Sequence, residues 1–111
     1  MTLSSTPAKR LGHFTPIGFE ADAAFLPVLG RLPEGLEGTL YRDGPNPQFP
    51  TDDAHLFTGD GMLHAFTLQG GRASYRNRWV RSNGWRAERG AGRRLYDAMG
   101  RPLDPEDPAL P

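Results

Sequence analysis

The sequence predicts an all-β, turn-rich fold. Fourteen glycines and eleven prolines occur among 111 residues, which is about twice the usual combined share. Residues 62–68 and 73–81 both alternate between apolar and polar positions, and the Gly70-Gly71 pair between them can take positive φ angles. Two alternating runs around such a pair predict a β-hairpin. This frequency of chain-breaking residues also excludes a helical bundle or a coiled coil.

The first half of the chain is expected to hold short strands. Residues 1–12 are polar and are predicted to be a flexible leader, with no apolar segment typical of a signal peptide. The apolar run at residues 25–32 predicts an edge strand, since Pro27 cannot donate to a ladder. Residues 39–42 predict a second strand. A rigid turn is expected at residues 43–47, because Gly44 permits a positive φ and the two prolines fix φ.

The region after the hairpin is expected to be less regular. Residues 85–96 predict a short helical or looped segment that Gly90 and Gly92 weaken. Four prolines between residues 100 and 111 predict an extended connector. We therefore divide the chain into a leader (1–12), one β-rich part (13–103) and a proline-rich connector (104–111), at which the chain is cut.

The charge of the chain is balanced overall but unevenly distributed. There are 13 basic and 13 acidic residues, yet residues 72–94 hold eight arginines against the single acid Glu88. A nucleic-acid or anionic-lipid surface with Tyr75, Trp79 and Trp85 as stacking partners is one interpretation. The other interpretation, which we favour, is a set of arginines that pair with acids elsewhere in a larger protein. We therefore expect no nucleic-acid partner.

Cysteine is absent, which excludes disulfides, thiolate zinc sites and cysteine nucleophiles. A small secreted domain usually carries disulfides, so the expected location is cytoplasmic. The motifs of serine hydrolases, phosphate-binding loops and dinucleotide sites are also absent. His55 and His64 flank a Gly-Asp-Gly turn at residues 59–61. A mixed histidine and carboxylate metal site there is one interpretation. The interpretation that we favour is an ordinary turn acid between two strand histidines, because Gly-Asp-Gly is a common turn and no ligand spacing recurs.

Three blocks resemble a known family. Residues 32–47 (LPEGLEGTLYRDGPNP), 55–66 (HLFTGDGMLHAF) and 74–81 (SYRNRWVR) are similar, in order and spacing, to the opening of the carotenoid cleavage oxygenases. The resemblance implies a seven-bladed β-propeller, of which this chain supplies the first one to two blades. It further implies a non-haem Fe²⁺ held by four histidines, and the use of O₂ to cleave a conjugated C=C bond into two carbonyl products.

The resemblance places the catalytic centre outside this chain. Three histidines are present and the family's centre needs four, so we assign no metal ligand and no catalytic residue here. The chain is thus expected to be an N-terminal fragment that is inactive by itself and depends on the rest of the propeller. Peripheral contact of the whole protein with a membrane is expected because the family's substrates are lipophilic.

Two residues are candidates for the substrate cavity. The resemblance places Phe57 near the cavity in the stilbene-cleaving branch, although an aromatic core residue beside a turn is an equal interpretation. It places Met99 where that branch has a tyrosine that hydrogen-bonds the phenol of its substrate, with Tyr96 nearby. Methionine cannot donate this bond, and an unpaired buried phenol costs roughly 1–3 kcal/mol. Met99 therefore favours a carotenoid or apocarotenoid. A small non-catalytic β module whose arginine-rich hairpin binds an acidic partner or nucleic acid remains the alternative.

Overall fold

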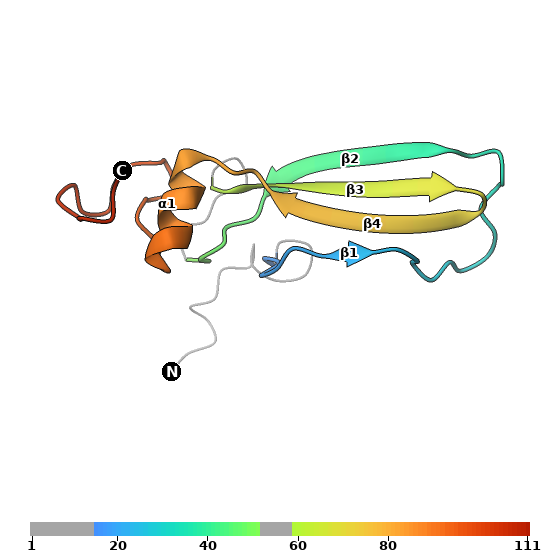
Figure 1. The fold of residues 1–111 in the computed structure, drawn as a ribbon, viewed down its shortest axis with the longest axis horizontal. Coiled ribbons are helices and arrows are strands. Elements are labelled where there is room, and N and C mark those ends of the chain that lie inside the picture. The colour runs from blue at the N-terminus through green and yellow to red at the C-terminus, as the bar shows by residue number, and fades with distance from the viewer. Residues whose placement is uncertain (1–14, 52–58) are drawn as a thin grey trace. The chain divides into compact units, whose positions relative to one another are not determined.

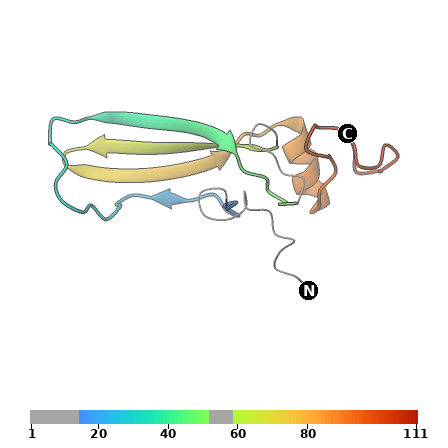
Figure 2. The same ribbon diagram turned by 180° about the vertical axis from the view of Figure 1, so that it is seen from behind.

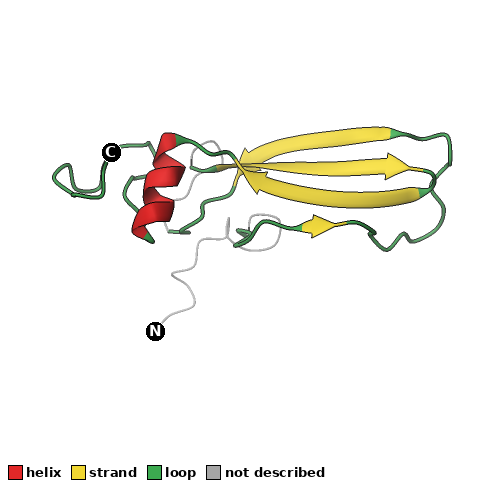
Figure 3. Cartoon of the chain, in the orientation of Figure 1, coloured by secondary structure: helices red, strands yellow, loops and turns green. Residues whose placement is uncertain are grey.

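The computed structural model describes residues 15–51 and 59–111. Their contacts divide them into two compact units. The sheet unit contains Phe19–Gly44 and Gly61–Val80, and the helix unit contains residues 15–18, 45–51, 59–60 and 81–111. Sheet dominates the regular structure, and α1 (Asn83–Ala91) is the one helix in the described ranges (Figure 3).

The sheet unit is built on the predicted hairpin, which is confirmed. Strands β3 (Gly61–Gln69) and β4 (Arg72–Trp79) pair antiparallel from Met62 opposite Trp79 to Gln69 opposite Arg72. Gly70 and Gly71 take φ angles of 58° and 75°, the left-handed values that a two-residue hairpin turn requires. The register places the side chains of Met62, His64 and Phe66 on the same sheet face as those of Tyr75 and Trp79.

Two further strands complete the sheet in the order β1-β4-β3-β2 (Figures 1 and 2). β2 (Gly38–Pro45) lies beside β3, and the two side-chain hydroxyls of Thr39 and Thr67 are 3.0 Å apart across this pair. β1 (Asp22–Ala23) pairs antiparallel with β4. Asp22 receives hydrogen bonds from Arg76 and Arg78, and the Arg78 bond is the main reason that its pKa is lowered.

Two local expectations are wrong. The predicted edge strand at residues 25–32 is absent, because the first strand ends at Ala23 and Gly30 turns the chain at a φ of 94°. Phe25 and Leu29 are exposed, so no buried face supports a strand there. The turn expected at residues 43–47 does not begin at Asp43, because β2 continues through Pro45. A proline is tolerated there because β2 is a terminal strand in the sheet order.

Buried asparagine Asn77 joins the irregular segment before β1 to β4. Its side chain is almost fully buried, with 2% exposed. Oδ1 accepts a hydrogen bond from the backbone N–H of Ala21 at 2.5 Å, and Nδ2 donates to the carbonyl of Phe19 at 3.4 Å. The Asn77 side chain therefore pairs with backbone groups that would bond to β4 if β1 were longer.

Helix α1 of the helix unit begins at a clear N-cap. Ser82 Oγ accepts a hydrogen bond from the N–H of Trp85 at 3.0 Å, as helix N-caps do. The helix ends at Gly92, whose φ of 69° and N–H bond to the Glu88 carbonyl form a left-handed C-cap. The predicted helical or looped segment at 85–96 is thus a helix that starts earlier and ends before Arg93.

The end of the chain is tied to this helix unit. Both guanidinium nitrogens of Arg93 donate to Asp107, at 2.6 and 2.8 Å. This bidentate pair lowers the pKa of Asp107 to about 2. The carboxylate is therefore charged throughout the neutral range, and the pair is expected to weaken only in strong acid.

We expect Asn77→Ala to release the segment before β1. The substitution leaves the N–H of Ala21 without its acceptor, and a buried unpaired group of this kind costs about 1–3 kcal/mol. Hydrogen exchange measured residue by residue should show strong loss of protection at Ala21. Gln69→Ala, at the exposed end of β3, is the control that should leave this amide protected. Unchanged protection in Asn77→Ala would contradict the role of Asn77.

The sheet unit is also expected to weaken in mild acid. His64 accepts or donates one hydrogen bond with the Tyr75 hydroxyl at 2.6 Å. Burial lowers its pKa below 6.5, the Arg42 charge lowers it further, and Asp43 acts in the opposite direction. The unfolded chain therefore binds this proton more readily than the folded chain, and stability falls as the pH drops below about 6.5.

Chemical denaturation at about pH 7.5 and about pH 5.5 tests this linkage. The native chain should unfold at lower denaturant concentration at the lower pH. His64→Gln removes the titrating group, so the difference between the two midpoints should shrink. An equal pH dependence in both proteins would assign it to other groups.

Candidate functional site

Helix α1 presents two buried side chains, Trp85 and Glu88, to the same side of the helix unit. Each is 7% exposed. The Ser82 cap orients the first turn, and Arg81 and Arg89 lie over the Trp85 ring with their guanidinium carbons at 4.3 and 5.4 Å from its centroid. These cation–π contacts hold the indole in place.

Glu88 connects the helix to the segment that follows it. Its Oε2 accepts hydrogen bonds from the N–H groups of Leu95, at 2.8 Å, and Tyr96, at 3.2 Å. Leu95 is 1% exposed, so this segment packs tightly behind the helix. A carboxylate that accepts two backbone N–H groups is a strong anchor, because bonds to a charged acceptor are the stronger class.

The segment after Tyr96 forms a tight turn. Asp97 Oδ1 accepts from the N–H groups of Met99 and Arg101, both at 2.9 Å. Gly100 takes a φ of 81°, and Tyr96 forms an isolated antiparallel bridge with Pro102. The turn at residues 97–100 is thus defined by its own side chain and by glycine geometry.

Asp60 is joined by hydrogen bonds to the segment at residues 46–48. The N–H of Asn46 donates to the Asp60 carbonyl at 2.6 Å, and the Asn46 side chain exchanges two hydrogen bonds with the backbone of Ile17. Asp60 Oδ2 accepts from the N–H of Gln48 at 3.0 Å. Burial raises the pKa of Asp60; the Gln48 bond opposes this rise and the Glu88 charge adds to it.

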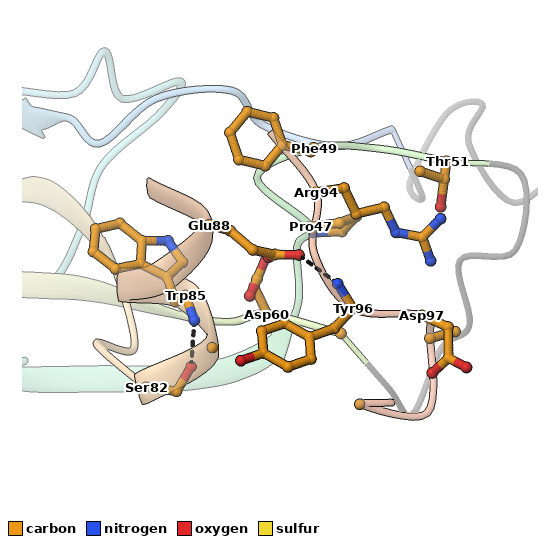
Figure 4. A pocket seen from close by; sticks show the side chains of 14 residues that line it. Pro47, Phe49, Thr51, Asp60, Ser82, Trp85, Glu88, Arg94, Tyr96 and Asp97 are labelled. Atoms are coloured by element: carbon orange, nitrogen blue, oxygen red, sulfur yellow. Dashed lines mark hydrogen bonds between the residues drawn. The ribbon is translucent and has the colours of Figure 1, made fainter. Parts of the chain in front are cut away.

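These segments enclose a cavity of about 380 Å³ within the helix unit. Figure 4 shows the carboxylates of Asp60 and Glu88 pointing toward one another, with the rings of Trp85 and Tyr96 nearby. Three aromatic side chains and three carboxylates contribute to the wall. The lining residues are Pro47, Phe49, Thr51, Gly59, Asp60, Ser82, Gly84, Trp85, Glu88, Arg94, Tyr96, Asp97, Ala98 and Gly100.

The residues predicted from the sequence have different places in the structure. Phe57 and His55 fall outside the described residues, although Thr51 and Gly59 on either side of that gap line the cavity. Met99 is 71% exposed at the tip of its turn, and its neighbours Ala98 and Gly100 line the wall. His64 lies in β3 of the sheet unit, where it contacts Tyr75.

Sequence reasoning missed Glu88 as a site residue. It was visible only as the single acid among eight arginines in residues 72–94. Its position four residues before Gly92 was a usable signal, because a side chain there can reach the chain that leaves a left-handed cap. Asp60 was noted as a turn acid, and its role in the cavity wall depends on the distant Gln48 and Asn46.

Other site classes find no support in the described parts of the chain. Within residues 15–51 and 59–111, no three histidine, aspartate or glutamate side chains gather where they could hold a metal ion. In the same ranges no helix has both the length and the apolar character needed to cross a membrane.

Three known proteins show what the chain is similar to. A carotenoid cleavage oxygenase of Mycobacterium tuberculosis is 50% identical over 74 residues, which are 64% of this chain and 15% of the relative. The crystal structure of a lignostilbene dioxygenase of Pseudomonas brassicacearum matches with a TM-score of 0.77 and 31% identity, over 88% of this chain and 22% of that one. The structure of cobalt-substituted Synechocystis apocarotenoid oxygenase matches with a TM-score of 0.68 and 34% identity, over 81% and 20%.

The match extends through almost all of the chain but through only a small part of its relatives. The chain spans between 15% and 22% of the length of the proteins named above. Residues 14–110 match the family model described as retinal pigment epithelial membrane protein, RPE65. With the three sequence blocks and the sheet that they form, this match shows that the chain belongs to the RPE65 and carotenoid oxygenase family.

Proposed function

We propose that the whole protein is a dioxygenase that uses O₂ to cleave a conjugated C=C bond of a carotenoid or apocarotenoid into two carbonyl products. The observation that carries this proposal is the 50% identity to a carotenoid cleavage oxygenase over 74 residues. In this proposal the chain supplies the first one to two blades of a seven-bladed β-propeller. It also forms part of the substrate cavity wall with the loops around Phe57 and Met99.

The proposal places the catalytic metal outside this chain. The residues described do not fit an iron centre: no three potential ligands gather among them, and the one described histidine, His64, is hydrogen-bonded to Tyr75. The whole protein would hold Fe²⁺ through histidines on other blades. The relative that was solved with cobalt supports a metal site in the family. The chain alone is therefore proposed to be inactive.

In this proposal the chain contributes part of the cavity wall and the hydrogen bonds that hold that wall in place. The cavity in the helix unit is walled by Phe49, Trp85 and Tyr96, which suit an apolar polyene end. The hydrogen bonds of Glu88 and Asp97 hold the turn at 97–100 in place, so the position of Met99 is set by rigid neighbours. We further propose a cytoplasmic location with peripheral membrane contact, since such substrates are lipophilic.

A second substrate class is a stilbene with a phenolic ring, because the lignostilbene dioxygenase structure has the higher TM-score of the two structures described above. Met99 argues against it, as methionine cannot donate to a phenol oxygen. The non-catalytic alternative is less well supported. The arginines that suggested it contact other groups of this chain: Arg76 and Arg78 bind Asp22, and Arg93 binds Asp107.

The activity is tested with protein expressed from the complete natural reading frame. Incubated with β-carotene or an apocarotenal in air, it should give two carbonyl products, and removal of iron by a chelator should abolish the reaction. The 111-residue chain should give no product and bind no stoichiometric iron. Absence of products from the complete, iron-loaded protein with both polyene and stilbene substrates would disprove the proposal.

The residue at position 99 is expected to separate the two substrate classes. Met99→Tyr adds a hydroxyl that can hydrogen-bond a phenol, so kcat/KM for a phenolic stilbene should rise about tenfold relative to that for an apocarotenal. Met99→Phe has the ring without the hydroxyl and is the matched control. Equal effects of the two substitutions would show that ring size, and not the hydrogen bond, determines the preference.

A further inference from the structure

The edge of β4 that faces away from β3 is covered by residues 19–26, which we call the strap and which form little strand (Figure 1). Within the strap, β1 pairs with β4 through two residue pairs. On either side of them, the N–H of Asn77 donates to the Ala21 carbonyl at 3.1 Å, and the N–H of Leu26 donates to the Ala73 carbonyl at 2.8 Å. Few backbone bonds therefore hold the strap, and side chains carry much of its docking.

Two carboxylates of the strap, two positions apart in the chain, bind this edge. The Glu20 carboxylate accepts the backbone N–H of Trp79 at 2.8 Å. Asp22 accepts from Nε of Arg76 at 2.8 Å and from one guanidinium nitrogen of Arg78 at 2.9 and 3.0 Å. The edge therefore favours a segment with acids at these two positions, because it presents one backbone donor and two guanidinium groups to them.

Apolar burial contributes little to this docking. None of the residues of the strap is buried, and Phe19 and Phe25 are 65% and 72% exposed. The ion pairs are also open to water, with 59% of the Asp22 side chain exposed, and exposed ion pairs contribute little to stability. The strap is thus expected to leave β4 more easily than the β3–β4 hairpin opens, because the hairpin strands pair from end to end.

The loop between the strap and β2 is suited to act as a hinge. Residues 27–37 contain no strand or helix, and Leu29 within them is fully exposed. A segment tethered by a flexible linker competes with free copies of itself at an effective concentration of the order of 1 mM. An identical segment from another molecule would make the same contacts with β4, and only the tether would be lost.

We propose that this edge of β4 is a docking site for residues 19–26 of a second copy of the chain, which replace the strap by strand exchange. The occupant is a second copy because the strap itself shows the fit, with its two acids on the donors of the edge. A strand added to a sheet edge gains main-chain hydrogen bonds, and its side chains give specificity. The inference goes beyond the proposed function, since it involves no substrate, no metal and no residue of the cavity lining.

Two single-cysteine copies test the exchange, since the chain has no cysteine of its own. Ala23→Cys is placed in one copy and Tyr75→Cys in the other, because these two positions lie directly opposite each other in the β1–β4 register. Directly opposed Cα atoms of antiparallel strands are about 4.5–5.5 Å apart, within the range of a disulfide. When the two copies are mixed under mild oxidation, a disulfide-linked heterodimer should form.

Gln69→Cys is the matched control for Tyr75→Cys, because Gln69 is exposed at the end of β3 and pairs with Arg72 instead of the strap. The Ala23→Cys copy should form a disulfide with the Tyr75→Cys copy about tenfold faster than with the Gln69→Cys copy. Equal rates, or no heterodimer with Tyr75→Cys, would overturn the inference.

One charge substitution should act in opposite directions in the two copies. Asp22→Asn in the Tyr75→Cys copy weakens its own strap and frees the edge, so the rate of heterodimer formation should rise about threefold. Asp22→Asn in the Ala23→Cys copy weakens the segment that docks, so the rate should fall by about the same factor. Glu37→Gln is the control in either copy, because Glu37 precedes β2 at the other edge of the sheet. No change, or a change of the same sign in both copies, would contradict the proposed docking.

A peptide keeps the test decisive if circular dichroism shows that Tyr75→Cys does not fold. A free peptide with the sequence of residues 17–26 is added at about 1 mM to the unaltered, isotope-labelled chain, and the amide signals are followed by NMR. The signals of β4 should shift, and a peptide carrying Glu20→Gln and Asp22→Asn should cause smaller shifts. Absence of shifts at β4, or equal shifts with both peptides, would rule out the exchange.

Discussion

Buried backbone groups need hydrogen-bond partners, and in a chain with so much irregular structure side chains have to supply many of them. Asn77 does this for Ala21 and Phe19 in the sheet unit. Asn46 does it for Ile17 in the helix unit. In each case one amide side chain reproduces the donor and acceptor of a neighbouring strand. Each unit can therefore hold its first segment in place although that segment forms little or no strand.

Glu88 likewise supplies an acceptor for backbone N–H groups, in this case just after the end of helix α1. The two N–H groups that it binds belong to the chain just after the Gly92 cap, which has left the helix without entering a sheet. A carboxylate can accept both donors at once, whereas a neutral side chain at this position would bind them more weakly. The charge has a second consequence, because Asp60 lies close enough for Glu88 to raise its pKa. Anchoring the backbone and charging the cavity are thus effects of one side chain.

The sequence predicted the hairpin well but not the segments around it. Alternation and the Gly70-Gly71 pair were sufficient for the hairpin, since its register follows from the turn alone. The strand expected at residues 25–32 failed because apolar content says nothing about whether a partner face exists, and Phe25 and Leu29 have none. The turn expected to begin at Asp43 failed for a related reason: β2 is a terminal strand, so it can include Pro45 without loss of a ladder bond. The cavity could not be predicted, because its walls come from segments joined only by tertiary hydrogen bonds.

The arginine-rich region has the composition of a binding surface, but several of its arginines contact groups of the chain itself. Arg76 and Arg78 clamp β1 through Asp22, while Arg81 and Arg89 enclose Trp85. These guanidinium groups contact a carboxylate or an indole ring of the chain itself. Arginine suits such planar partners better than lysine does.

The same arrangement separates a position that holds the cavity wall, Glu88, from one at the exposed tip of a turn, Met99. Met99 is exposed at the tip of a turn. Asp97 and Glu88 hold this turn by accepting hydrogen bonds from the N–H groups of Met99 and Tyr96. A substitution at position 99 can therefore be made without disturbing the hydrogen bonds that hold the cavity wall. A substitution at Glu88 removes or weakens those bonds, and for that reason its isosteric glutamine variant is more informative than its removal.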